Sequence, residues 1–138
     1  MRLPAPAIVI EFRIEARSGV APYRQIVQQV RHALQLGLLG VGDQLPTVKE
    51  VVAQVAINPN TVFKAYRELE HEGLVEGRPG LGTFVTRTLV STPLAAQRSL
   101  LADLARWLAK ARRAGFDDDG IAALFESAVR DDAARGVA

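Results

Sequence analysis

The chain has 138 residues, 49% of them hydrophobic and 23% charged, so it holds one compact domain or a small domain with an appendage, and its net charge of +2 neither favours nor excludes a nucleic-acid partner. The absence of cysteine excludes a disulfide scaffold or a thiolate metal site, and two distant histidines leave little for zinc, so we expect no metal and no cofactor. The longest apolar run, residues 3–10, is too short to cross a bilayer and lacks a signal cleavage site, so we expect a cytoplasmic protein without a membrane partner.

Residues 7–14 begin apolar and then alternate, a pattern that predicts a short strand ending before Ser18. Pro22 suits a first helical turn, because its missing N–H needs no partner there. A helix of about four turns follows, because its apolar residues fall on one face: Ile26, Val27, Val30, Ala33 and Leu34. The glycine-rich residues 37–42 end this helix.

A second helix is predicted after Pro46. Thr47 and Glu50 have the spacing of a capping box, in which the hydroxyl accepts from the third helical N–H and the carboxylate accepts from the N–H of the cap residue. The buried stripe of this helix is predicted to be Val48, Val51, Val52 and Val55.

The third helix is predicted to start with Asn58 as N-cap and Pro59 as its first residue, and to end before Gly73. Its buried face is expected to hold Val62, Tyr66 and Leu69. Only about three residues, 56–58, separate the second and third helices, so the pair is predicted to be a helix-turn-helix.

Two short strands at residues 74–76 and 83–87 are predicted to flank the glycine-rich loop 77–82, and this hairpin forms a wing. Residues 88–96 show no periodicity and are interpreted as a linker. Two more helices follow. The first has a broad apolar face and ends at Gly115, and the second begins with three aspartates at the positive end of its dipole.

The helix-turn-helix and its wing supply candidate DNA contacts. The second helix of such a motif presents its N-terminal residues to base edges, while the first crosses the backbone. Amides pair with adenine, basic and hydroxyl groups contact bases or phosphates, and a glycine-rich tip permits close approach to a groove. The predicted DNA-contacting residues are Thr47, Lys49, Asn58, Asn60, Thr61, Lys64, Arg67, Arg78 and Gly80.

Each of these residues also has a purely structural interpretation. Capping explains Thr47, a helix start explains Asn58, and the turn of a hairpin explains Gly80, whereas Lys64 and Arg67 fit a solvated helix face. Their common order along one short segment favours the DNA-binding interpretation.

Four blocks, at residues 45–50, 58–62, 66–75 and 80–85, closely resemble the winged-helix domain of GntR-family bacterial transcription regulators. The resemblance covers about residues 20–88, and the short C-terminal region is similar to that of the YtrA-like subfamily. It implies a mainly α fold, in which a winged helix-turn-helix with a two- or three-stranded wing precedes a two-helix dimerisation region. It also implies a homodimeric repressor that binds an operator palindrome.

Two residues depart from the family pattern. Lys49 stands where the family usually has a DNA-contacting Arg, which keeps the charge but loses the bidentate fork. Phe63 occupies a position that is commonly polar in the third helix, which is the recognition helix of the motif. It either contacts a thymine methyl group or simply packs, and we favour packing.

The chain is predicted to divide into a DNA-binding part, residues 1–90, and a helical part, residues 91–138. The second part is too small to bury its own core, so it either folds back on the first part or pairs with a second chain. The twofold symmetry of an operator favours the homodimer. The residues predicted to form its interface are Leu100, Leu104, Trp107, Leu108, Ile121, Leu124 and Phe125.

A pocket for a small-molecule effector is expected either between these two helices or between them and the winged helix. Arg106, Arg112 and Arg113 either bind an acidic effector or balance the charges of Asp103 and of residues 117–119, and we favour the balance.

The distribution of charge predicts how DNA is bound. Residues 1–90 hold 10 basic and 8 acidic side chains, and residues 91–138 hold 7 of each. So slight an excess requires segregation of charge on the surface. The basic residues expected to face the duplex are Lys49, Lys64, Arg67 and Arg78, and the acidic ones expected to be turned away or paired are Glu68, Glu70 and Glu72.

These observations favour a DNA-binding regulator over two alternatives. One is a winged helix that assembles proteins without binding DNA. The other, an enzyme, is disfavoured, because the sequence has no Ser/His/Asp or Cys/His set and the glycine-rich loop at residues 77–82 leads into a strand, not a helix N-terminus.

Overall fold

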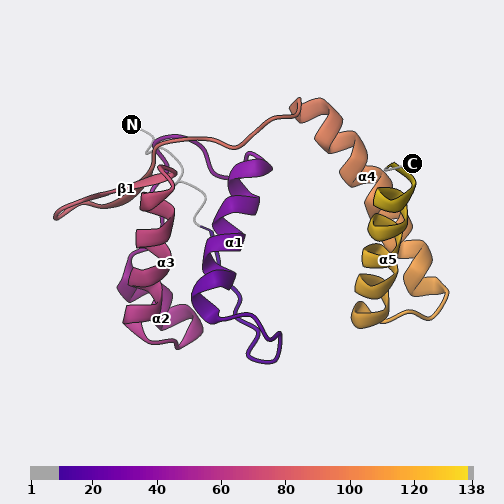
Figure 1. Ribbon diagram of the computed structural model, residues 1–138, viewed down its shortest axis with the longest axis horizontal. Coiled ribbons are helices and arrows are strands. Elements are labelled where there is room, and N and C mark those ends of the chain that lie inside the picture. The colour runs from indigo at the N-terminus through magenta and orange to yellow at the C-terminus, as the bar shows by residue number, and fades with distance from the viewer. Residues whose placement is uncertain (1–9, 137–138) are drawn as a thin grey trace, which may run out of the picture. The chain divides into compact units, whose positions relative to one another are not determined.

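The computed structural model describes residues 10–136 (Figure 1), and the chain divides into two compact units between Ser91 and Thr92. Within these residues, the first unit holds α1 (Pro22–Gln35), α2 (Val48–Val55), α3 (Pro59–His71), β1 (Val75–Arg78) and β2 (Gly82–Val85). The second holds α4 (Leu94–Arg113) and α5 (Asp118–Gly136). The mainly helical winged helix-turn-helix is therefore confirmed. None of the helices in this part of the chain is long and apolar enough to span a membrane.

Hydrogen bonds confirm the predicted starts of α2 and α3. Thr47 Oγ1 accepts from the Glu50 N–H at 3.1 Å, and Glu50 Oε1 accepts from the Thr47 N–H at 3.1 Å, which completes the capping box. Asn58 Oδ1 accepts from the Asn60 N–H at 2.8 Å. Between the helices Ala56 takes a left-handed conformation, φ 51°, and so ends α2 abruptly.

The core of the first unit forms where α3 packs on α1 and α2. The predicted inward faces of α1 and α3 are confirmed, with Ile26 and Leu69 fully buried. The predicted stripe of α2 is confirmed only in part: Val51 is fully buried, whereas the other three valines are half-buried and pack against the core. The Tyr66 hydroxyl is also buried and donates to the Pro46 carbonyl oxygen at 2.6 Å. This bond connects α3 to the loop that precedes α2, so it helps to fix the position of the two helices of the motif relative to each other.

The predicted strand at residues 7–14 is wrong for residues 10–14, while residues 7–9 lie outside the described residues. The alternation is correct, since Phe12 is buried between exposed neighbours, but the backbone pairs with side chains. Gln25 exchanges two hydrogen bonds with the backbone of Glu15, at 2.8 and 2.9 Å, and Gln29 exchanges two with that of Arg13, at 3.0 and 2.7 Å.

Helix geometry explains this pairing. Four residues of a helix rise about 6 Å, which is close to the length of two extended residues, about 6.6 Å. Two glutamines one turn apart therefore match alternate residues of the extended segment and replace a neighbouring strand.

The wing differs from its predicted bounds. β1 and β2 pair antiparallel with Val75 opposite Val85 and Arg78 opposite Gly82, and a single bridge joins Gln44 to Phe84. The strands thus reach further into the predicted loop 77–82. The reason is a tight tip, in which Leu81 N–H donates to Arg78 O at 2.9 Å.

This tip has the sequence of a type II turn. Pro79 stands second in the turn, where its fixed φ is suitable, and Gly80 stands third with φ 77°. A residue with a Cβ is strained in that conformation, so the Pro-Gly pair sets the short tip.

The predicted linker 88–96 is too long, because α4 begins at Leu94. The two alanines that follow Leu94 are strong helix formers and extend the helix toward Pro93. At the start of α5, Asp117 Oδ1 accepts from the Gly120 N–H at 2.8 Å. Among the described residues of this unit only Ala111 and Ile121 are buried.

Candidate nucleic-acid interface

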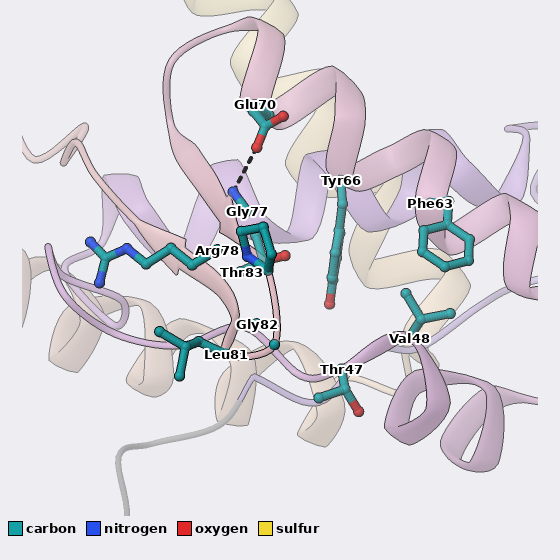
Figure 2. Close-up of a pocket in the computed structure, with 12 residues that line it drawn as sticks. Thr47, Val48, Phe63, Tyr66, Glu70, Gly77, Arg78, Leu81, Gly82 and Thr83 are labelled. Atoms are coloured by element: carbon teal, nitrogen blue, oxygen red, sulfur yellow. Dashed lines mark hydrogen bonds between the residues drawn. The ribbon is translucent and has the colours of Figure 1, made fainter.

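A groove of about 620 Å³ lies between α3 and the wing, and the start of α2 lines it at one end (Figure 2). It brings together three of the predicted DNA-contacting residues, Thr47, Arg78 and Gly80. Arg67 lines a smaller hollow that shares several residues with this groove. Three segments distant in sequence therefore converge on one face, as a winged helix requires.

The other predicted residues lie outside the groove. Asn58 and Asn60 are exposed at the N-terminus of α3, with Thr61 half-buried beside them, and Lys49 is exposed in the first turn of α2. Their exposure leaves these side chains accessible to a duplex.

Lys64 is positioned by an aromatic ring. Its Nζ lies 4.0 Å from the centroid of the Tyr23 ring, which belongs to α1 and packs against the core. The ring attracts the ammonium group and restricts its position without neutralising its charge. No ion pair forms at Lys49, Lys64 or Arg67 within residues 10–136.

Arg78 lies at the end of β1, beside the turn of the wing. Its guanidinium is 4.7 Å from the centroid of the Phe84 ring and 3.8 Å from a carboxylate oxygen of Glu76. Both partners of this ion pair are about half exposed, so the pair contributes little and leaves Arg78 available to another anion.

The prediction that the acidic residues of α3 are turned away or paired is correct for Glu72 but not for Glu70, which lines the groove. Among the described residues, the buried Oε2 of Glu68 has no hydrogen-bond partner. Glu72 Oε2 lies 2.7 Å from Nη1 of Arg31 on α1. Glu70 lines the groove, where its Oε2 accepts from the backbone N–H of Gly77 at 2.6 Å (Figure 2). The carboxylate thus connects the recognition helix to the wing.

Gln44 makes a second connection to the wing, and like Glu70 it is absent from the predicted site. Its Nε2 donates to the Leu81 carbonyl oxygen at 3.1 Å. Gly82 takes φ 127°, a conformation in which a residue with a Cβ is strained, and a Cβ there would also displace the Gln44 amide. No sequence signal marks Gln44, because both contacts span more than thirty residues.

The packing interpretation of Phe63 accounts for only part of this side chain. The ring lies beside Val48 at the α2 end of the groove (Figure 2), yet half of the residue, 50%, remains exposed. Simple packing therefore does not describe this side chain fully, because half of it is accessible to solvent in the groove.

The predicted dimerisation residues lie on the two helices of the second unit. Leu100 is 64% exposed, and Leu124 is also exposed. The others line an apolar hollow of about 340 Å³ between α4 and α5: Leu104, Trp107, Leu108, Ile121 and Phe125.

The arginines of this unit favour the interpretation of charge balance. Arg106 pairs with Asp103, and Arg112 Nη1 lies 2.8 Å from Asp118 Oδ1. The structure thus pairs two of the three candidate effector ligands with acidic neighbours.

Comparison with known proteins identifies the family. Residues 22–85 match the model of the bacterial regulatory proteins of the gntR family. The chain is 37% identical over 89 residues to the HTH-type transcriptional repressor YtrA of Bacillus subtilis (strain 168), a match that covers 64% of this chain and 68% of that protein. The chain belongs to the GntR family. As a GntR-family member, it is a DNA-binding transcription regulator, which confirms the resemblance inferred from the four sequence blocks.

Solved structures extend the GntR likeness. YtrA from Sulfolobus acidocaldarius, a GntR-family transcription factor, is 28% identical with a TM-score of 0.51, and the match covers 72% of this chain and 99% of that one. A transcriptional antiterminator from Listeria monocytogenes EGD-e is 27% identical with a TM-score of 0.54, over 87% and 90% of the two chains. The YtrA-like character of this GntR regulator is therefore confirmed.

Proposed function

We propose that this GntR regulator is a repressor that binds an operator palindrome as a homodimer. The observation that carries the proposal is the convergence of the start of α2, the exposed face of α3 and the wing tip on one side of the first unit. This arrangement fits a recognition helix in the major groove and a wing at the adjacent minor groove. The name of the Bacillus relative, a transcriptional repressor, supports the direction of control.

The roles of the side chains follow from their chemistry. Asn58, Asn60 and Thr61 meet bases or phosphates at the start of α3. Thr47 and Lys49 meet phosphate at the start of α2, where free N–H groups add their dipoles. The remaining contacts are assigned to the DNA backbone and the minor groove, through Arg67, Arg78 and Gly80.

The homodimer is supported by the second unit. Its two helices leave large apolar side chains exposed, including Leu100 and Phe125, which is 49% exposed. Two helices with so little buried surface need a partner, and an isologous pair of the same segments supplies one. Residues 91–138 are therefore proposed as the dimerisation region, and residues 1–90 as the DNA-binding part.

The mechanism is occlusion of a promoter on the nucleoid, in the cytoplasm. A small-molecule effector that binds beside α4 and α5 relieves the repression by changing the spacing of the two DNA-binding parts. The effector acts only if it binds one spacing more tightly than the other.

A gel shift of the full chain against the DNA upstream of its own gene tests this function. Specific binding should weaken by about a thousandfold or more between 50 and 200 mM salt, because each phosphate contact releases counterions. Failure to bind any duplex at low salt, together with a stable complex with another protein, would instead favour the protein-assembly module.

A further inference from the structure

We propose that Phe63 reads the 5-methyl group of a thymine in the major groove, so that each half-site carries an A·T pair at the position that this ring faces. The inference rests on the proposed function, because it adds one specific base contact to the operator complex.

Phe63 lies in the middle of the DNA-facing surface of α3. Asn60, Phe63, Lys64 and Arg67 follow the i, i+3, i+4, i+7 pattern of one helix face, and all four are exposed. The opposite face, which includes Val62 and Leu69, is fully buried in the core. Phe63 is thus the single apolar side chain of that four-residue stripe.

The environment of the ring leaves it accessible from the groove. Val48 of α2 lies beside it, and both residues line the groove between α3 and the wing (Figure 2). Half of Phe63 stays accessible to solvent. The ring therefore presents an apolar surface that is free to meet a ligand in the groove.

The chemistry of the groove identifies that ligand. Every base pair presents hydrogen-bond donors or acceptors in the major groove, and the thymine methyl group is its apolar feature. A phenyl ring neither donates to nor accepts from those polar atoms as a base contact, so it favours the pair that offers a methyl group. Removal of that methyl group leaves the ring against a polar, hydrated edge.

Leu81 provides a matched control on the same unit. It lies in the wing tip and is 66% exposed, so it too is a large accessible apolar side chain. The wing is assigned to the minor groove, where the thymine methyl group is absent. Substitution of Leu81 therefore tests apolar contact in general without removing the proposed methyl contact.

The experiment uses a duplex selected from a randomised library by the full chain. Each thymine of the selected half-site is then replaced in turn by deoxyuridine, which lacks only the methyl group. At one position the loss of the methyl group should weaken binding by the wild-type chain, about fourfold when one half-site is substituted and about fifteenfold when both are. These factors correspond to ~0.8 kcal/mol for each buried methyl group.

The variants locate the contact. Phe63→Ala should bind the thymine and deoxyuridine duplexes equally at that position, Phe63→Leu should keep most of the difference, and Leu81→Ala should keep all of it. Thermal unfolding of each variant verifies that it is folded.

Two results would overturn the inference in distinguishable ways. Selection of no specific duplex would remove the proposed function and this contact with it. The chain could instead bind a specific duplex while Phe63→Ala leaves the effect of every deoxyuridine substitution unchanged. That result would leave the proposed function intact and eliminate the thymine contact alone.

Discussion

Glu70 and Gly77 join the recognition helix to the wing through one hydrogen bond, in which a carboxylate oxygen of α3 accepts from a backbone N–H of β1 at 2.6 Å. The two elements that would enter adjacent grooves of DNA are thereby held at one spacing. The bond also places a negative charge in the groove, which would repel a phosphate backbone in the proposed complex.

Two neutral substitutions of Glu70 separate the bond from the charge. Glu70→Gln keeps an oxygen acceptor for the Gly77 N–H and removes the charge, so it should bind the operator at least as tightly as the wild-type chain. Glu70→Ala removes both and should bind about tenfold more weakly than Glu70→Gln, the equivalent of the ~1.4 kcal/mol expected for such a bond. A hydroxyl-radical footprint should lose the protection given by the wing only in Glu70→Ala. Equal affinity and equal footprints for the two variants would show that the bond between Glu70 and Gly77 does not position the wing on DNA.

Lys64 should contribute affinity without sequence specificity. Its ammonium group is held over Tyr23 but keeps its charge, so Lys64→Gln should weaken binding to specific and random duplexes alike. It should also reduce the slope of log affinity against log salt by about one for each protomer. Lys64→Arg is the matched control and should keep the slope. An unchanged slope in Lys64→Gln would show that this side chain does not reach phosphate.

The capping box at Thr47 should stabilise the first unit measurably. Thr47→Ala should lower the free energy of unfolding in urea by about 1 kcal/mol, because the N–H of Glu50 loses its acceptor. Thr47→Ser keeps the acceptor and should stay close to the wild-type value. If Thr47→Ala has the same midpoint of urea unfolding as the wild-type chain but binds the operator poorly, Thr47 contributes to DNA binding and not to stability.

Tyr66 should make stability depend on pH in the alkaline range. Burial of the phenol, with a smaller effect from Glu50, raises the pKa of Tyr66 well above its usual value of 10.0. The folded state therefore holds the proton more tightly than the unfolded state does. The stabilisation is complete below pH 10 and is lost as the pH rises further, by up to about 1.4 kcal/mol for each pH unit.

Tyr66→Phe tests this dependence. At pH 7 it should be less stable by about 1 to 3 kcal/mol, because the buried Pro46 carbonyl loses its donor. Between pH 10 and 11 its free energy of unfolding should fall less steeply than that of the wild-type chain. Parallel curves for the two proteins would mean that the phenol ionises as readily in the folded state as in the unfolded state.

A charge in the proposed dimer interface should separate the protomers. Leu104→Glu or Leu124→Glu should sediment as a monomer and bind the operator much more weakly, because the carboxylate would be desolvated between apolar helices. Ala109→Glu is the control, since Ala109 is exposed on another face of α4. Sedimentation of Leu104→Glu as an intact dimer would remove this assignment.

The sequence by itself determined the elements whose cause is local. The caps at Thr47 and Asn58 use hydrogen bonds that span two or three residues, so their signals lie within one turn of the helix they start. The inward faces of α1 and α3 follow from apolar periodicity, and the order of the four blocks identified the family. These features need no knowledge of distant residues.

Tertiary structure decided what depends on contacts between distant segments. The alternation at residues 10–14 correctly predicted which side chains are buried, but the partner of that backbone is a pair of glutamine amides on α1. Likewise, only packing shows that Phe63 stays half exposed beside Val48 and that Glu70 reaches the wing. The physical reason is common to these cases: a side-chain hydrogen bond or a half-covered ring leaves no periodic pattern, since its partner is chosen by how the folded elements approach one another.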